Sequence, residues 1–177
     1  ILRKHFEIHT QLESETLLYH DCDIALARPL NVELFESDNI CYMSDTRSYI
    51  GSNYILSKGK DIFDEMVRIM NIEPQLVIDN EENTGGAQYI LKGIDAFYWA
   101  RVENDCKNLY KAITKLNNQK KQIEPTYHEL QIWCADMWAV LWGAWKLGAQ
   151  TVIEPGLSFS WGSSNLAEYL NNNIMVI

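Results

Sequence analysis

Residues 16–24, Thr-Leu-Leu-Tyr-His-Asp-Cys-Asp-Ile, decide the fold that we expect for this chain. The first five residues are typical of a buried β-strand, which ends directly at two carboxylates, Asp21 and Asp23. In open α/β sheets, ligands bind beyond the carboxyl ends of the strands. Extended residues at positions i and i+2 point to the same side, so both carboxylates are expected to face one ligand. Cys22, between them, is then expected to point into the core.

Strands and helices alternate along the rest of the chain, which predicts an α/β fold with a mixed sheet flanked by helices. Further strands are expected at residues 40–43, 75–78, 87–91 and 151–154, and helices at residues 2–13, 61–70, 95–115 and 128–147. Asp61 is the expected N-cap of the second helix. Residues 117–124 are rich in charges and amides and are expected to form a connector, and residues 156–164 a loop around Trp161.

Length and composition favour one domain, residues 1–177, in which 47% of the residues are apolar. The net charge of -9 argues against a basic groove for nucleic acid and against binding to an anionic membrane. No apolar run is long enough to cross a bilayer, and no signal peptide is visible. The four cysteines match no zinc or disulfide pattern, so we expect reduced cysteines and a cytoplasmic location.

The two carboxylates of the opening segment predict a metal site. Close carboxylates repel each other and prefer a shared cation. Hard oxygen ligands select Mg²⁺ or Mn²⁺, which complete their coordination with water and substrate phosphates. We therefore expect Asp21 and Asp23 to bind Mn²⁺ or Mg²⁺. The alternative is that the pair only caps a turn.

A third carboxylate, Asp136, lies in the aromatic sequence Trp-Cys-Ala-Asp-Met-Trp of residues 133–138. A carboxylate in a buried helix needs a partner or a function. Apolar neighbours would raise its pKa and suit it to general-base catalysis. The alternative is a structural aspartate bonded to the backbone or to an indole N–H. Glu129, seven residues earlier, is expected on the same helix face.

Other residues are candidates for substrate binding. Asp45 follows the strand at 40–43 and could bond a substrate hydroxyl, or it could cap a turn. Gly85 and Gly86 would let a ligand approach the backbone, or they could form a simple turn. Trp161 could stack on a sugar face.

Residues 17–24 followed by Pro29-Leu30 resemble the Asp-x-Asp segment of GT-A glycosyltransferases. The segments Cys-Tyr-Met-Ser-Asp-Thr (41–46), Thr-Gly-Gly-Ala-Gln (84–88) and 133–138 are similar to later parts of that fold. The resemblance covers about residues 15–165, with an acceptor-side portion at about 40–165. It implies a nucleotide-sugar donor, a carbohydrate acceptor, metal binding by the Asp-x-Asp carboxylates and substrate contacts from Gly85, Gly86 and Gln88.

The chain departs from that family in two respects. The family carries its nucleotide-base-binding strands before the Asp-x-Asp motif, and only twenty residues precede Asp21. That half is then expected to be absent from this chain or abbreviated. Many members also use a C-terminal histidine as a metal ligand, and none of the four histidines lies near Ile177.

Two further functions remain open. Haloacid-dehalogenase-like phosphatases also place an Asp-x-Asp after an N-terminal strand, although Ala25 departs from their pattern. Their further motifs would fall on Ser44, Lys58 and Asp79. The third possibility is a carbohydrate-binding domain without catalysis, which becomes the preferred interpretation if the nucleotide-binding half is absent.

Overall fold

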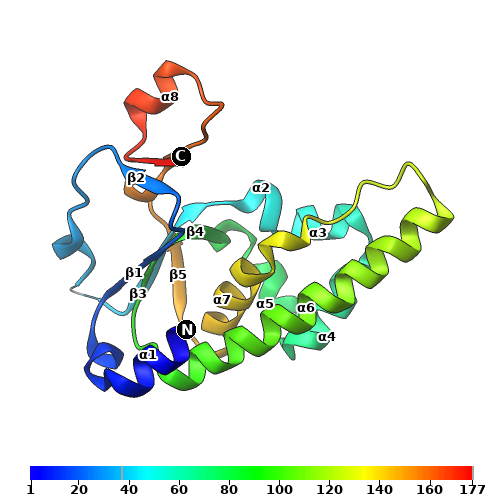
Figure 1. The fold of residues 1–177 in the computed structure, drawn as a ribbon, viewed down its shortest axis with the longest axis horizontal. Helices are drawn as coiled ribbons and strands as arrows, with labels where there is room; N and C mark the ends of the chain where they lie inside the picture. Colours follow the sequence, from blue (N-terminus) through cyan, green and yellow to red (C-terminus); the bar gives the residue numbers. More distant parts are fainter. Residues whose placement is uncertain (37, 177) are drawn as a thin grey trace.

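The main sheet has three strands that run in one direction and one that runs against them. The computed structural model describes residues 1–36 and 38–176 (Figure 1). The strand order is β1 (Leu17–His20), β4 (Gly85–Leu91), β3 (Ile40–Asp45) and β5 (Gln150–Ile153). β4 is antiparallel to β1 and β3, and β3 is parallel to β5. The expected α/β class with a mixed sheet is confirmed, and β1, β3 and β5 all end at one edge.

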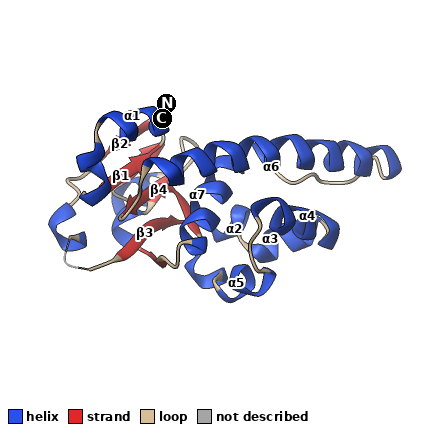
Figure 2. Cartoon of the chain, turned by 90° about the horizontal axis from the view of Figure 1, so that it is seen from below, coloured by secondary structure: helices blue, strands red, loops and turns tan. Residues whose placement is uncertain are grey.

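Helices cover one face of this sheet, as Figures 1 and 2 show. α7 (Ala135–Lys146) packs on β4, where the Tyr89 hydroxyl donates to the carbonyl of Met137. The long α6 (Ala96–Ile123) packs on α7, where the Tyr98 hydroxyl donates to the carbonyl of Val140 at 2.6 Å. α1 (Leu2–Ile8) and α4 (Lys60–Met70) lie against α6. Alternate strand residues, such as Met43 and Tyr89, therefore face the main core.

A second, smaller sheet contains β2 (Ile24–Leu26), β7 (Ile174–Val176) and β6 (Phe159–Ser160), in that order. β2 follows the Asp-x-Asp segment directly, and its Ile24 pairs with Val176. Ile90, on the other face of the main sheet, packs with Phe35, Leu157 and Ile174. The C-terminal segment is thereby held beside the exit of the Asp-x-Asp turn.

Short elements complete the described chain. They are α2 (Arg47–Ile50), α3 (Ser52–Lys58), α5 (Pro74–Asp79), α8 (Leu166–Asn171), and the 3₁₀ turns η1 (Thr10–Ser14), η2 (Val32–Phe35), η3 (Glu81–Asn83), η4 (Ile132–Cys134) and η5 (Pro155–Leu157). Among the described residues, no helix is both long and apolar enough for a bilayer span.

Three predicted elements were wrong in type or extent. Residues 75–78 are helical in α5, because Pro74 at the first turn favours a helix and a short apolar run does not separate the two states. The expected connector at 117–124 continues α6 to Ile123, since its Gln and Lys residues are good helix formers. The helix expected at 128–147 begins only at Ala135.

Two further expectations about helices also fail. The helix expected at 2–13 divides into α1 and η1 at His9. Asp61 does not cap α4, whose N-cap is Gly59; its carboxylate instead pairs with Lys120 at 2.8 Å. β1 is only half-buried, because it lies at the edge of the sheet.

Candidate functional site

The candidate residues lie at the edge of the sheet where β1, β3 and β5 have their carboxyl ends. Asp21 and Asp23 follow β1, and Asp45 is the last residue of β3. α7 begins at the same edge, with Asp136 in its first turn. The chain beyond β5 passes through η5 and β6 to Trp161. Elements distant in sequence therefore place polar and aromatic side chains around one edge.

The charge of Asp136 acts on Asp21 across this edge. Burial raises the pKa of Asp21, and the charges of Asp136 and then Asp23 raise it further, partly offset by His20. Burial also raises the pKa of Asp136, partly offset by hydrogen bonds from the backbone N–H groups of Met137 and of Asp136 itself. The carboxylates thus lie in a field that favours protonation or a bound cation.

The same two carboxylates also raise the pKa values of two neighbouring groups, Cys134 and Tyr19. Burial raises the pKa of the Cys134 thiol to about 12, with contributions from the charges of Asp136 and Asp21. Burial raises the pKa of the Tyr19 hydroxyl to about 12, again with contributions from Asp136 and Asp21. Cys134 and Tyr19 therefore lie around the Asp21–Asp136 pair.

The Asp-x-Asp segment is an exposed turn between β1 and β2. Cys22 is exposed, and the prediction that it points into the core was wrong, because the extended backbone ends at His20. Within residues 1–36 and 38–176, no group of three or more His, Cys, Asp or Glu side chains is arranged to hold a metal. Asp21 and Asp23 can therefore supply at most a partial ligand set, with the remaining positions left to water or phosphate.

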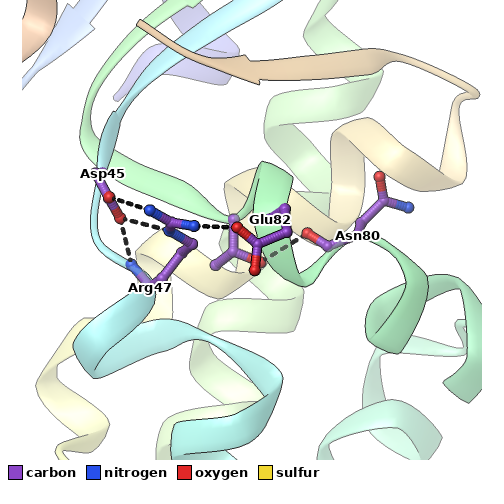
Figure 3. Close-up of polar contacts among 5 residues, drawn as sticks. Asp45, Arg47, Asn80 and Glu82 are labelled. Carbon is purple, nitrogen blue, oxygen red and sulfur yellow. Dashed lines mark hydrogen bonds and ion pairs between the residues drawn. The ribbon is translucent and has the colours of Figure 1, made fainter. Parts of the chain in front are cut away.

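Asp45 is held by an arginine (Figure 3). Arg47 donates from Nη2 to Asp45 Oδ2 at 2.7 Å, from Nε to Oδ1 at 3.0 Å, and from its backbone N–H to Oδ1 at 3.1 Å. Arg47 also pairs with Glu82. These bonds lower the pKa of Asp45. Asp45 thus caps the turn into α2, and its charge is largely compensated.

Asp45 and Trp161 line one cavity of about 320 Å³. The other lining residues include Ser48, Tyr49 and Phe159. The Trp161 ring lies 5.1 Å from Phe159 and 6.2 Å from Tyr49, both edge-on, and its side chain is 45% exposed. Two residues that the sequence predicts for substrate binding are therefore brought together, 116 positions apart in the chain (161 minus 45).

Tyr49 lines this cavity and also lies within the electrostatic range of Asp21. Its pKa is raised by burial and by the charges of Cys134, Asp21 and Asp45. The sequence marks residues 49–56 only as an aromatic and polar stretch, so nothing in it singles out Tyr49. Its place follows from α2, which begins two residues beyond the end of β3.

Gly85 and Gly86 are buried inside β4. A Cβ on Gly85 would meet the Met43 side chain and the carbonyl of Ser44. A Cβ on Gly86 would meet Met137 and the Tyr89 hydroxyl. The space that a side chain would need at each glycine is therefore occupied by neighbouring protein atoms.

Gln88 is also fully buried and lies at a β-bulge. The β3–β4 register shifts between Met43 and Ser44, and Ala87 takes a positive φ of 64°. Gln88 Oε1 accepts from the Ser44 hydroxyl at 2.5 Å, while Nε2 has no hydrogen-bond partner in the described part of the chain. Bulges of this kind re-aim side chains beside functional sites.

Other predicted residues lie outside this arrangement. Glu129 is not helical; it is exposed and pairs with Lys121 at 2.8 Å, so the shared face with Asp136 was wrong. Ser44 is completely buried, and its hydroxyl also donates to the carbonyl of Leu157. Lys58 lies 5.0 Å from the Tyr54 ring, and Asp79 accepts from Gln75 on α5.

A comparison of the chain with protein-family models, with curated proteins and with solved structures finds no match. Its function is therefore argued from the geometry of this edge.

Proposed function

We propose that the chain is part of a metal-dependent glycosyltransferase that moves a sugar from a nucleotide-diphosphate sugar to an acceptor hydroxyl. The observation that carries this proposal is the placement of three carboxylates at the carboxyl edge of the sheet, where Asp21 and Asp23 follow β1 and Asp136 lies in the first turn of α7. The mixed α/β sheet is compatible with the GT-A class that residues 17–24 resemble.

The donor end of the site would be formed by Asp21 and Asp23. Two carboxylates that repel each other in an exposed turn, one of them partly buried, fit a hard cation, Mn²⁺ or Mg²⁺, that keeps water and phosphate ligands. A metal bound there neutralises the charge that develops on a diphosphate leaving group. The exposure of the turn leaves space for a diphosphate.

Asp136 is the candidate general base. Its burial raises its pKa toward the range in which a carboxylate accepts a proton efficiently. It stands in the first turn of α7, so the helix N-terminus stabilises its charged form and fixes its position. Its task would be to take the proton of the acceptor hydroxyl.

The cavity beside Trp161 would hold a sugar ring. Aromatic rings stack on the apolar face of a sugar, and Asp45, Ser48 and Asn172 offer polar atoms around the same space. Because Arg47 compensates the charge of Asp45, this cavity is suited to a neutral, hydroxylated ligand.

The phosphatase alternative is less well supported. It requires the Ser44 hydroxyl to reach a phosphate, yet Ser44 is fully buried and its hydroxyl is bonded to Gln88 and Leu157. Asp79 is exposed at the end of α5 and bonded to Gln75. A binding domain without catalysis would keep the cavity and show no turnover.

Titration calorimetry with uridine and guanosine diphosphates, with Mn²⁺ and after chelation by EDTA, tests the donor site. We expect binding that requires the metal and that Asp23→Ala abolishes. Asp64→Ala is the matched control, because Asp64 is an exposed carboxylate on α4 whose partner is Lys60. Equal metal-dependent affinity in wild type and Asp23→Ala would refute the metal site. Hydrolysis of a generic phosphomonoester that Asp21→Asn abolishes would refute glycosyl transfer.

A further inference from the structure

A second cavity, of about 340 Å³, lies on the helical side of the sheet between α1, β1, α6 and α7. Its lining is mostly apolar, from Leu2, Tyr19, Trp99, Val102 and Cys106, and it includes the carboxylate-bearing residue Asp136. Tyr19 and Asp136 also belong to the site described above, whereas Leu2, Trp99, Val102 and Cys106 do not. The cavity therefore adjoins the proposed general base and shares no lining residue with the Trp161 cavity.

The charged groups at the mouth of this cavity compensate one another. Lys107 pairs with Glu103 at 2.5 Å, and Arg3 lies 3.6 Å from Glu7. Asp136 has no such cationic partner among the described residues, and its charge, like that of Asp21, acts on Tyr19 in the cavity wall. An anionic ligand would be repelled here.

Trp99 supplies an unused hydrogen-bond donor. The residue is only 4% exposed, and in the described chain its indole N–H has no hydrogen-bond partner. Buried polar groups without a partner are uncommon in folded proteins and point to a bound water or a ligand. Trp99 also lines the cavity, so an oxygen acceptor on an apolar molecule bound there would be a partner for this group if the side chain turns toward it.

We propose that this cavity binds the apolar group of the acceptor, an uncharged alkyl or aryl alcohol or glycoside, and that this places the acceptor hydroxyl at Asp136. The assignment as acceptor rests on the proposed glycosyl transfer, whereas binding of the apolar group does not. In the transfer, the hydroxyl oxygen forms a bond to the anomeric carbon of the donor sugar. The bond from that carbon to the diphosphate oxygen breaks, the electron pair leaves with the diphosphate, and Asp136 takes the hydroxyl proton.

The cavity is tested by calorimetry with octyl β-glucoside below its micelle-forming concentration, without metal or nucleotide. Glucose and octylamine are the comparison ligands. We expect octyl glucoside to bind and glucose to bind at least 10-fold more weakly. Cys106→Trp, which fills the cavity, should weaken octyl glucoside binding at least 10-fold. Asn104→Trp is the control, because Asn104 is exposed on the same helix and does not line the cavity.

A second measurement keeps the proposal testable if Cys106→Trp fails to fold. The alkylation of wild-type cysteines by N-ethylmaleimide is measured by mass spectrometry. Octyl glucoside should slow the alkylation of Cys106 and leave the rate at the exposed Cys22 unchanged. Absence of binding, equal binding by Cys106→Trp, or preference for octylamine would overturn the proposal. If the wild type did not bind a nucleoside diphosphate in the presence of metal, the donor site would be refuted instead. The two failures are therefore distinguishable.

Discussion

The charge of Asp136 raises the pKa of Asp21 more than the charge of Asp23 does, although Asp23 is only two residues from Asp21 in the sequence. Asp136 begins α7 and is half-buried, whereas Asp23 lies in an exposed turn where water screens its charge. The edge of the sheet therefore couples two carboxylates that lie 115 positions apart (136 minus 21). This coupling has measurable consequences for stability and for catalysis.

Asp136→Asn should raise the free energy of unfolding at pH 7 and lower the pKa of Asp21. A carboxyl group with a raised pKa binds its proton more tightly in the folded state than in the unfolded state. The contribution of these two groups to stability is therefore fully present below their ordinary pKa of 3.8 and is lost as the pH rises through the raised pKa values of Asp21 and Asp136. Urea unfolding between pH 4 and pH 8 should show this fall in the wild type and a smaller one in Asp136→Asn.

The same variant should keep donor binding and lose turnover, by about 100- to 10,000-fold if Asp136 is the general base. Asp64→Asn, on exposed α4, is the control for the loss of one carboxylate. Lower stability with normal turnover would identify Asp136 as a structural residue of the α7 N-terminus. Unchanged stability and turnover would contradict both roles.

Arg47→Met should make Asp45 titrate at a higher pH. The Arg47 guanidinium holds the pKa of Asp45 below its usual value, so this pair stabilises the fold above pH 3.8, and that contribution is lost as the pH falls through the lowered pKa. The side chains of Arg47 and Asp45 are 37% and 45% exposed, so we expect a loss of only about 0–1 kcal/mol at pH 7. Urea unfolding at pH 7 and pH 2.5 should give a larger difference between variant and wild type at pH 7 than at pH 2.5.

Much of the edge could be predicted from the sequence, because its signals are local. A strand that ends in carboxylates is visible in residues 16–23 and again at Asp45, and strands in one direction end at one edge. The aromatic composition around Asp136 indicates burial, and its pKa is raised by burial as expected. These predictions depend on neighbours within a few residues.

The remaining errors come from tertiary contacts that a local pattern does not contain. The chain before α7 is held in a loop by the buried side chain of Asn117, which donates to the carbonyl of Leu130 and accepts from its N–H. That contact joins α6 to residues 124–131 and replaces the helix expected there. In the same way, the shared cavity of Asp45 and Trp161 depends on β6, which is held by its pairing with β7.

Trp161→Ala should weaken sugar binding while leaving the fold and the binding of a nucleoside diphosphate unchanged. The ring is 45% exposed and packs edge-on against Phe159 and Tyr49, so its removal takes away a stacking surface. We expect a loss of about 0.5–1.5 kcal/mol in the binding of a nucleotide sugar relative to the nucleoside diphosphate. Trp133→Ala is the control, because Trp133 is 63% exposed and does not line this cavity. Equal losses in both variants would argue against a sugar site at Trp161.

Gly85→Ala distinguishes a glycine required by packing from one that admits a ligand. Gly85 is paired with Asp45 in the β3–β4 ladder and is buried. A Cβ at this position would overlap the carbonyl oxygen of Ser44 and the Met43 side chain, and the backbone carbonyl has no rotamer into which it can move. We therefore expect Gly85→Ala to lower the free energy of unfolding by about 1–3 kcal/mol.

The matched control for this substitution is Gly162→Ala. The nearest atom to a Cβ at Gly162 is the carbonyl oxygen of Val176 at 3.9 Å, which is ordinary van der Waals contact. Its stability should change by less than about 0.5 kcal/mol, as for most surface substitutions. Urea unfolding of both variants, with calorimetric titration of the nucleotide sugar, separates the two roles of Gly85. A Gly85→Ala protein of normal stability that no longer binds the sugar would show that the glycine admits substrate and that the packing around β4 yields to a methyl group.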